Sequence, residues 1–165
     1  MEVPVQYRLV YLLSFLYGHQ NEKIIVFVSN CETVNFLQMV LQKFDWNECG
    51  RKTDLEQREA IEAGGAENKQ ILIEGNFCRL HGDMEQEHRK KNYFAFDKNE
   101  KSVLICNDVA SRGLDFKNVA WIVQWDLSSN IKEYVNRVGR TARIAAEGSA
   151  LSFLMPDEIE YVKYL

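Results

Sequence analysis

The sequence contains no apolar run approaching the roughly 18 residues that a membrane-spanning helix needs. Its N-terminus lacks a basic segment followed by an apolar stretch and a small-residue cleavage site, so we expect no secretory signal. The four cysteines form no C-x-x-C pair, which argues against a zinc site and suits a reducing compartment. We therefore expect a protein of the cytosol or nucleus that has no membrane partner.

Several catalytic motifs are also missing. The chain has no G-x-S-x-G elbow, no H-E-x-x-H metalloprotease motif and no G-x-G-x-x-G dinucleotide motif. It has no G-x-x-x-x-G-K-[ST] phosphate loop and no acidic metal-binding motif after one, so it lacks the parts that would cradle a triphosphate. His81 and His88 have no third ligand at a usual spacing, so we expect packing or surface roles for them and no metal site.

Short apolar runs alternate with helical patterns along the 165 residues, of which 46% are hydrophobic. This length suits a single domain, residues 1–165. The predicted strands are 24–28, 77–81, 102–106, 119–123 and 149–154. The predicted helices are 5–17, one capped by Ser29 or Asn30, about 85–96, about 131–138, and a closing helix from Pro156. Strands that alternate with helices predict an α/β fold with a mainly parallel central sheet of five or more strands and helices on both faces.

Residues 44–76 interrupt this alternation and are interpreted as a surface insertion. Between Asp45 and Glu74 there are eight acids and four bases, a balance of −4, which equals the net charge of the chain. The remaining residues are therefore neutral in total. Because salt screens each charge over about 8 to 10 Å, this average leaves room for a local basic face. The acidic insertion is a possible site for a protein partner.

One basic stretch, residues 134–143, stands out. Arg137, Arg140 and Arg143 recur at every third residue with no acid between them. Neighbours three apart share one side of a helical turn, so the three guanidinium groups could face one target rich in anionic oxygens. A glycine inside such a turn costs about 1 kcal/mol relative to alanine, so Gly139 indicates a close approach of the backbone. The alternative is a solvated basic turn.

The loops that follow the predicted strands should share one edge of a parallel sheet, here called the carboxyl rim. These loops are 29–30, 81–83, 107–115 and 126–130. Gly82 and Gly113 would offer exposed amides, and Arg89 could add a cation, which together suit a phosphodiester backbone. Plainer roles stay open: Gly82 could end a strand, Asp108 could be held by a neighbouring arginine, and Asp115 could be a turn residue.

Four segments, taken in order, resemble motifs of the second RecA-like lobe of the DEAD-box RNA helicases. These segments are Val26-Phe-Val-Ser-Asn30, residues 80–89 with Gln86 and Arg89, residues 104–116, and residues 134–143. The resemblance implies a three-layer RecA-like domain. The run 79–87, the long insertion and the ending 156–165 are similar to the nucleolar branch that assists assembly of the large ribosomal subunit. The resemblance thus implies a role in ribosome biogenesis and a location in the nucleus, within the nucleolus.

The same resemblance implies roles for individual residues. Arg140 and Arg143 would be catalytic, as arginine fingers that reach the terminal phosphate of ATP in the closed enzyme. Gly113 and Asp115 would contact the nucleotide, and Mg would be held mainly by the N-terminal RecA-like lobe of the longer chain. The residues that would line the RNA backbone track are Asn30, Gly82, Arg89, Asn107 and Asp108. The chain is therefore expected to be half of an ATP-dependent RNA helicase and inactive alone.

Two residues depart from the family pattern. Asn107 replaces a threonine that touches an RNA phosphate, and Asn136 replaces a histidine that contacts the other lobe. Asparagine can form a neutral hydrogen bond at either place but cannot become cationic, so coupling to ATP is in question. Two alternatives follow: the lobe of a DNA helicase or remodeller, and a non-catalytic protein and RNA interaction module that recruits a protein through 44–76.

Overall fold

The computed structural model describes residues 1–43, 76–111, 113–141 and 148–164. Most of the predicted insertion at 44–76 lies outside the described residues, and so does Arg143. The strands are β1 (Lys23–Phe27), β2 (Asn76–Leu80), β3 (Ser102–Cys106), β4 (Trp121–Gln124) and β5 (Ser149–Ser152). The helices are η1 (Val5–Tyr7), α1 (Arg8–Gly18), α2 (Cys31–Lys43), α5 (Gln86–Lys98), α6 (Asp108–Ser111), α7 (Ile131–Val138) and η2 (Pro156–Tyr164).

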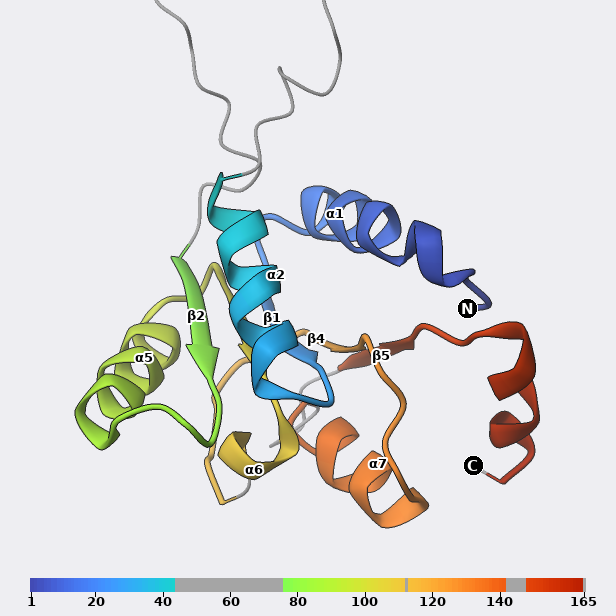
Figure 1. Ribbon diagram of the computed structural model, residues 1–165. Helices are drawn as coiled ribbons and strands as arrows, with labels where there is room; N and C mark the ends of the chain where they lie inside the picture. The colour runs from blue at the N-terminus through green and yellow to red at the C-terminus, as the bar shows by residue number, and fades with distance from the viewer. Residues whose placement is uncertain (44–75, 112, 142–147, 165) are drawn as a thin grey trace, which may run out of the picture.

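The described strands form one five-stranded sheet in the order β2-β3-β1-β4-β5, and every neighbouring pair is parallel. In the central strand β1, Ile25 lies opposite Leu104 of β3 on one side and Ile122 of β4 on the other. All five residues of β1 and of β3 are buried, as expected for parallel strands covered on both faces. The predicted α/β fold with a parallel sheet is confirmed (Figure 1).

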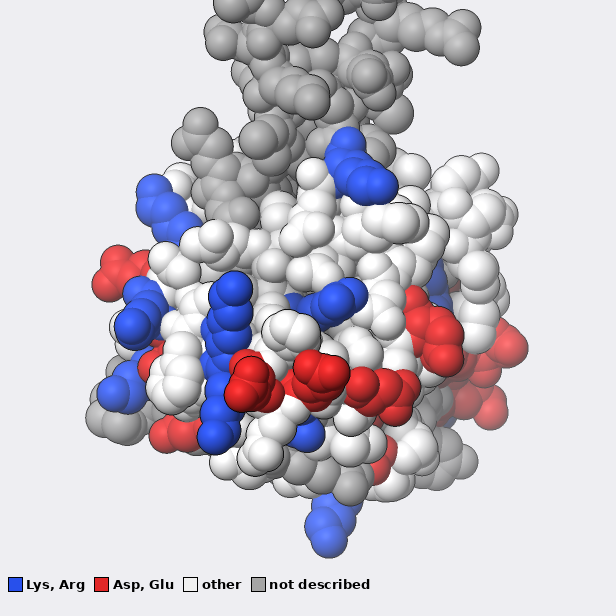
Figure 2. All heavy atoms as spheres, turned by 60° about the vertical axis from the view of Figure 1, so that its left-hand side comes forward, with Lys and Arg blue, Asp and Glu red and all other residues white. Residues whose placement is uncertain are grey.

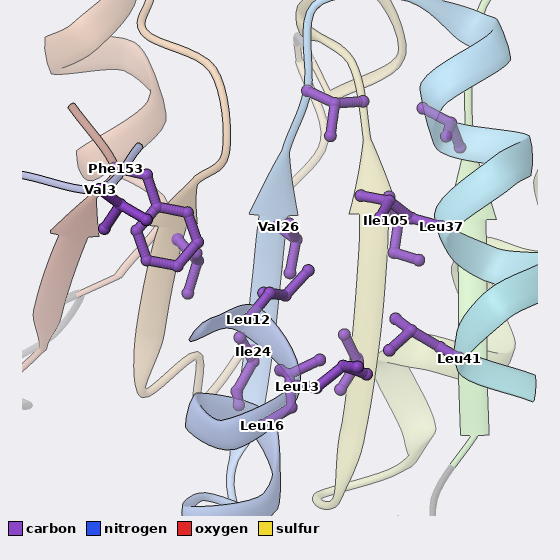
Figure 3. Packing of buried hydrophobic residues seen from close by; sticks show 14 residues of the cluster. Val3, Leu12, Leu13, Leu16, Ile24, Val26, Leu37, Leu41, Ile105 and Phe153 are labelled. Atoms are coloured by element: carbon purple, nitrogen blue, oxygen red, sulfur yellow. The ribbon is translucent and has the colours of Figure 1, made fainter. Parts of the chain in front are cut away.

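Two apolar clusters cover the two faces of the sheet. On one face, α1 and α2 pack against alternate residues of the central strands, for example Leu12 and Leu41 near Val26 and Ile105 (Figure 3). On the other face, Phe96 of α5 packs with the intervening residues of the same strands, together with Phe116. The alternation follows from the two-residue period of a strand. The result is the predicted three-layer arrangement of helices, sheet and helices.

The chain ends differ from the predicted helices. The first predicted helix, 5–17, is divided into a 3-10 turn, η1, which follows Pro4, and the α-helix α1. The closing segment η2 does begin at Pro156, but its helical type is 3-10 rather than α. Beside β5, the amide of Val3 donates to the carbonyl of Leu154 at 2.7 Å. None of the described helices is long and apolar enough to cross a membrane.

Because the strands are parallel, the loops after β1, β2, β3 and β4 meet at the carboxyl rim. Helices α6 and α7 also lie at this rim, at the lower side of Figure 1. The side-chain oxygen of Asn30 accepts from the amide of Thr33 at 2.7 Å and thereby caps α2. The side chain of Asn130 caps α7 in the same way, through the amide of Glu133 at 2.9 Å.

Candidate functional site

The first arginine of the basic stretch, Arg137, is buried, with 2% of its surface exposed. Its guanidinium donates to both carboxylate oxygens of Asp108, at 2.7 and 2.6 Å, and to the carbonyl of Asp126 at 2.7 Å. It also donates to Gln124 and lies 5.2 Å from the ring centre of Phe27. The prediction that three arginines face one external target is therefore wrong for Arg137. A buried guanidinium needs all its partners, and the protein interior supplies them.

The carboxylate of Asp108 binds Arg137, so the structure shows the ion pair with a neighbouring arginine that the sequence left open. A contact of Asp108 with RNA, which the resemblance implied, stays a prediction. The pair joins the start of α6 to α7. Asp108 thus fixes the position of the loop after β3, next to the other residues of the rim.

Arg140, the second arginine, has a different environment and is partly exposed. Its Nη1 donates to the carbonyl of Leu114, and its Nε donates to the carbonyl of Asn136 at 3.2 Å. These bonds place the guanidinium beside the turn that contains Gly113 and Asp115. The structure therefore brings together three of the four residues that the resemblance assigned to the nucleotide.

The turn beside Arg140 is fixed by its own contacts. Gly113 has φ +76°, a left-handed conformation that favours glycine. The hydroxyl of Tyr93 donates to the carbonyl of Asp115 at 2.9 Å, and Phe116 is buried against Phe96. Burial and the negative charges of Asp97 and Asp115 raise the pKa of Tyr93, so its hydroxyl stays protonated and donates. The turn is thus held in place while the Asp115 side chain stays exposed.

Gly139 ends α7 between the two arginines. Its amide donates to the carbonyl of Val135 at 2.8 Å, and a Cβ at this position would lie 3.0 Å from the same oxygen. This oxygen belongs to the preceding turn of α7 itself, so an approach of the backbone to a ligand at Gly139 stays a prediction. Next to it, the hydroxyl of Thr141 donates to the carbonyl of Val119 and anchors the chain that follows.

Three residues predicted for the RNA track lie on the accessible part of the rim. Asn30 is exposed at the start of α2, Gly82 is exposed after β2, and Arg89 is partly exposed on α5. A Cβ at Gly82 would lie 3.7 Å from Val109, an ordinary contact, so packing does not require glycine there.

Asn107 also belongs to the predicted RNA track, and only 6% of its surface is exposed. Its amide nitrogen donates to the sulfur of Cys31 at 3.4 Å, and its backbone N–H donates to the carbonyl of Leu80 at 3.3 Å. The residue thus joins the ends of β1, β2 and β3. The side chain of Asn136, which also departs from the family pattern, lies on the exposed side of α7.

Sequence reasoning missed a second buried arginine. Arg8, 6% exposed, donates to Glu158 at 3.1 Å and to Asp126 at 3.4 Å. The other oxygen of Asp126 accepts from the amide of Ser29 at 2.8 Å. An arginine in register with Leu12 and Leu16 on the apolar side of α1 was the available signal. This network ties the first helix and the closing segment to the rim.

The rim also contains an unpredicted cluster of metal-ligating side chains. Cys31, His81 and Asp83 each place one ligand atom within 4.8 Å of the others. His81 is 6% exposed, and burial, followed by the charge of Arg79, lowers its pKa, so the ring is neutral near pH 7. A pocket of about 430 Å³ adjoins the cluster, and its lining includes Asn35 and Arg79.

Comparison with known proteins supports one family. Residues 7–145 match the model of the helicase conserved C-terminal domain. DEAD-box ATP-dependent RNA helicase 17 of Oryza sativa subsp. japonica is 39% identical over 158 residues, which cover 95% of this chain and 25% of that protein. ATP-dependent DNA helicase DDX31 of Homo sapiens is 40% identical over 168 residues, which cover 99% of this chain and 18% of that protein. The chain thus spans about a quarter or less of the length of these relatives.

Solved structures agree with the sequence comparison. The structure described as Mss116p DEAD-box helicase domain 2 bound to an RNA duplex matches with a TM-score of 0.74 and 25% identity, over 99% of this chain and 56% of that chain. This similarity confirms the RecA-like fold and the resemblance to a DEAD-box second lobe. With a family model that covers most of its residues and a fold that agrees, this chain belongs to the helicase conserved C-terminal domain family.

Proposed function

We propose that this chain is the second lobe of an ATP-dependent RNA helicase, which supplies arginine fingers to ATP and half of an RNA backbone track. The observation that supports this proposal best is the hydrogen bond from Arg140 to the carbonyl of Leu114. It holds a partly exposed guanidinium beside Gly113 and Asp115, at the edge of a parallel sheet where such folds bind their ligands.

In this proposal, Arg140 and Arg143 meet the charge that develops on the transferred phosphoryl group of ATP. An arginine in this role is worth about 10³ to 10⁵ in turnover. Gly113 allows close approach of the nucleotide, and the exposed carboxylate of Asp115 accepts from a ribose hydroxyl. These groups bind and orient; they do not hold the Mg that accompanies ATP.

The described residues fit that division of roles. The one group of three metal-ligating residues found among them mixes a thiol, an imidazole and a carboxylate, whereas Mg²⁺ prefers oxygen ligands. The resemblance implies that Mg is held mainly by the N-terminal RecA-like lobe of the longer chain. ATP hydrolysis accordingly needs both lobes, and we expect none from these 165 residues alone.

For RNA, the exposed positions Asn30, Gly82 and Arg89 would contact the phosphate backbone directly. Asn107 and Asp108 would contribute chiefly by fixing the loop after β3, since their side chains bind Cys31 and Arg137. The similar Mss116p domain 2 is described as bound to an RNA duplex, which supports an RNA ligand. The relative DDX31 is described as a DNA helicase, so DNA is the competing ligand.

The ATPase of the complete protein tests the finger assignment. Arg140→Ala and Arg143→Ala are each expected to lower kcat by about 10³ or more, with the Kd for RNA largely unchanged. Lys132→Ala, which removes an exposed cation from α7, is the matched control and should leave turnover unchanged. Unchanged turnover in both arginine variants would contradict the proposal, as would RNA-stimulated hydrolysis by the isolated chain.

We also propose a place in ribosome biogenesis, with localisation to the nucleolus, on the resemblance of 79–87 and 156–165 to the nucleolar branch. Microscopy of the tagged complete protein against a nucleolar marker tests this proposal. Deletion of residues 47 to 74 distinguishes the proposed helicase from the alternative, a non-catalytic interaction module. Loss of partner capture with intact RNA-dependent ATPase would identify 44–76 as a docking segment on an active helicase, whereas absent ATPase in the undeleted protein would favour an interaction module.

A further inference from the structure

Cys31, His81 and Asp83 come from two loops of the carboxyl rim, those after β1 and β2. Cys31 begins α2 after β1, while His81 and Asp83 follow β2. The sulfur of Cys31, a ring nitrogen of His81 and a carboxylate oxygen of Asp83 all lie within 4.8 Å of one another. The three side chains offer a soft, an intermediate and a hard ligand atom at one point on the surface.

The hydrogen bonds around His81 determine which ring nitrogen is available. The Oδ1 atom of Asn35 accepts from Nη1 of Arg79 at 2.6 Å, and a guanidinium can only donate, so this amide atom is an oxygen. The same oxygen lies 3.1 Å from Nε2 of His81, which must therefore carry the proton. In a neutral ring, Nδ1 is then the atom with the lone pair.

Nδ1 of His81 is buried, and no described residue supplies it with a hydrogen bond partner. Leaving a buried acceptor without a partner costs about 1 to 3 kcal/mol. A metal ion that takes this lone pair would remove the cost. An imidazole whose other nitrogen donates to an amide oxygen is also the usual form of a metal-ligating histidine, because the second bond fixes the ring.

The other two side chains can adjust to an ion. Cys31 is partly exposed, and its sulfur already accepts a hydrogen bond from the amide nitrogen of Asn107 at 3.4 Å. Asp83 is exposed on a turn, so its carboxylate can rotate at little cost. Bond lengths of about 2.0 to 2.3 Å around zinc bring ligand atoms to roughly 3.3 to 3.8 Å apart, so a contraction of about 1 Å completes the set.

We propose that Cys31, His81 and Asp83 form a Zn²⁺ site, with the fourth tetrahedral position open to water. The mixed sulfur, nitrogen and oxygen ligands select zinc over Mg²⁺ or Ca²⁺, which take oxygen ligands. The site is additional to the proposed helicase function and stands without it.

Charges of both signs surround His81, and the largest charge effect on it comes from Arg79. Glu32 and Asp83 act on His81 with negative charge, against the positive charges of Arg79 and Arg89. Figure 2 shows acidic side chains gathered toward the carboxyl rim of this face, beside basic ones. Glu85 also lines the adjoining pocket. A bound ion would tie the loop after β2 to the start of α2.

Metal titration of the isolated chain tests the site. The chain would carry Cys49→Ser, which removes the thiol that lies outside the described residues, and would be freed of metal by a chelator. Zn²⁺, added in competition with a chromophoric chelator, is expected to bind with a stoichiometry of one. Co²⁺ is expected to give a thiolate charge-transfer band and the visible spectrum of a tetrahedral site. Absence of either signal would overturn the proposal.

Variants then assign the ligands. Cys31→Ala should abolish the charge-transfer band, and His81→Ala and Asp83→Asn should each weaken Zn²⁺ binding. Asn35→Ala, which removes the bond that orients His81, should weaken it by about 10- to 100-fold. His88→Ala, which removes an exposed imidazole from the lining of the same pocket, is the matched control and should bind Zn²⁺ like the parent.

Two outcomes of the variant series would contradict the assignment. Zn²⁺ binding that survives in Cys31→Ala, or that is lost in His88→Ala, would indicate adventitious surface binding. Circular dichroism of the metal-free variants checks that each is folded. If a substitution prevents folding, the alkylation rate of Cys31 in the Cys49→Ser parent decides: Zn²⁺ should slow modification, and an unchanged rate would refute the site.

Discussion

The guanidinium of Arg137 binds the carboxylate of Asp108 through two hydrogen bonds, from Nε at 2.7 Å and from Nη2 at 2.6 Å. Arg137 belongs to α7 and Asp108 begins α6, so the pair joins the basic stretch to the loop after β3. The arginines of the basic stretch therefore differ in role. Arg137 is internal, whereas Arg140 is partly exposed.

Removing the bidentate geometry of this pair should destabilise the fold. Arg137→Lys keeps the charge but loses the paired bonds and the contacts with Gln124 and Asp126, so we expect a loss of about 3 kcal/mol in unfolding free energy. Urea unfolding of the isolated chain measures it. Lys132→Ala on the same helix should change stability by less than about 0.5 kcal/mol. Equal midpoints for the two variants would contradict a structural role for Arg137.

Asn30 allows capping and RNA binding to be separated. Asn30→Ala should cost about 1 kcal/mol, because the amide of Thr33 loses its acceptor. Asn30→Asp should restore the cap while placing a negative charge on the proposed phosphate track. We therefore expect Asn30→Asp to have the stability of the parent and weaker RNA binding. Unchanged RNA affinity in Asn30→Asp would remove Asn30 from the track.

Backbone contacts on the rim predict binding that depends on salt and little on sequence. With fluorescently labelled single-stranded RNA, the logarithm of the association constant should fall linearly with the logarithm of salt concentration. Arg89→Ala should reduce the magnitude of the slope by about 0.7, the share of one phosphate. Lys163→Ala, an exposed cation on η2, is the control. The same strand made of DNA should bind more weakly; equal or tighter binding to DNA would favour a DNA helicase.

Cys78 predicts a loss of stability at alkaline pH. Burial raises its pKa from 9.0 to about 11. Below pH 9.0 the thiol is protonated in both the folded and unfolded states, whereas between pH 9.0 and about 11 it ionises only when unfolded, which favours unfolding. Cys78→Val should therefore lose less stability than the parent across this window in urea titrations. Burial also raises the pKa of Cys106, so Cys78→Val should keep the part of the alkaline stability loss that Cys106 causes. Identical stability profiles against pH for the parent and Cys78→Val would argue against the Cys78 contribution.

The fold was largely predictable because its strands are local signals. The strand Ser102–Cys106 was predicted with its observed bounds, and the bounds predicted for β1 differ from the observed ones by a single residue. Short β-branched runs between polar turns usually form buried strands. The helical type at the two ends was not predictable. Periodicity alone does not distinguish a 3-10 turn such as Val5–Tyr7 from the first turn of an α-helix.

Parts of the site that lie within the recognised motifs were predictable from the sequence. Contacts between residues of different strands and helices were not. Arg140 lies beside the turn that contains Gly113, and the contact of these residues with a nucleotide stays a prediction. A three-residue spacing, however, gives no information on which side of α7 faces the core, so the inward position of Arg137 was not foreseen. The ends of β1 and β2, which bring Cys31 to His81, are separated by β3 in the sheet and far apart in sequence, so ligand spacing could not reveal the cluster. The roles of Arg143 and of the segment 44–76 stay predictions, because Arg143 and most of that segment lie outside the described residues.

Lys43, which ends α2, and Asn76, which begins β2, both lie at the amino edge of the sheet, since α2 runs back from the carboxyl rim and Asn76 pairs with Ser102. Both residues are exposed, so a tag or crosslinker attached at Lys43 or at Asn76 would lie at the pole opposite the proposed ligand contacts.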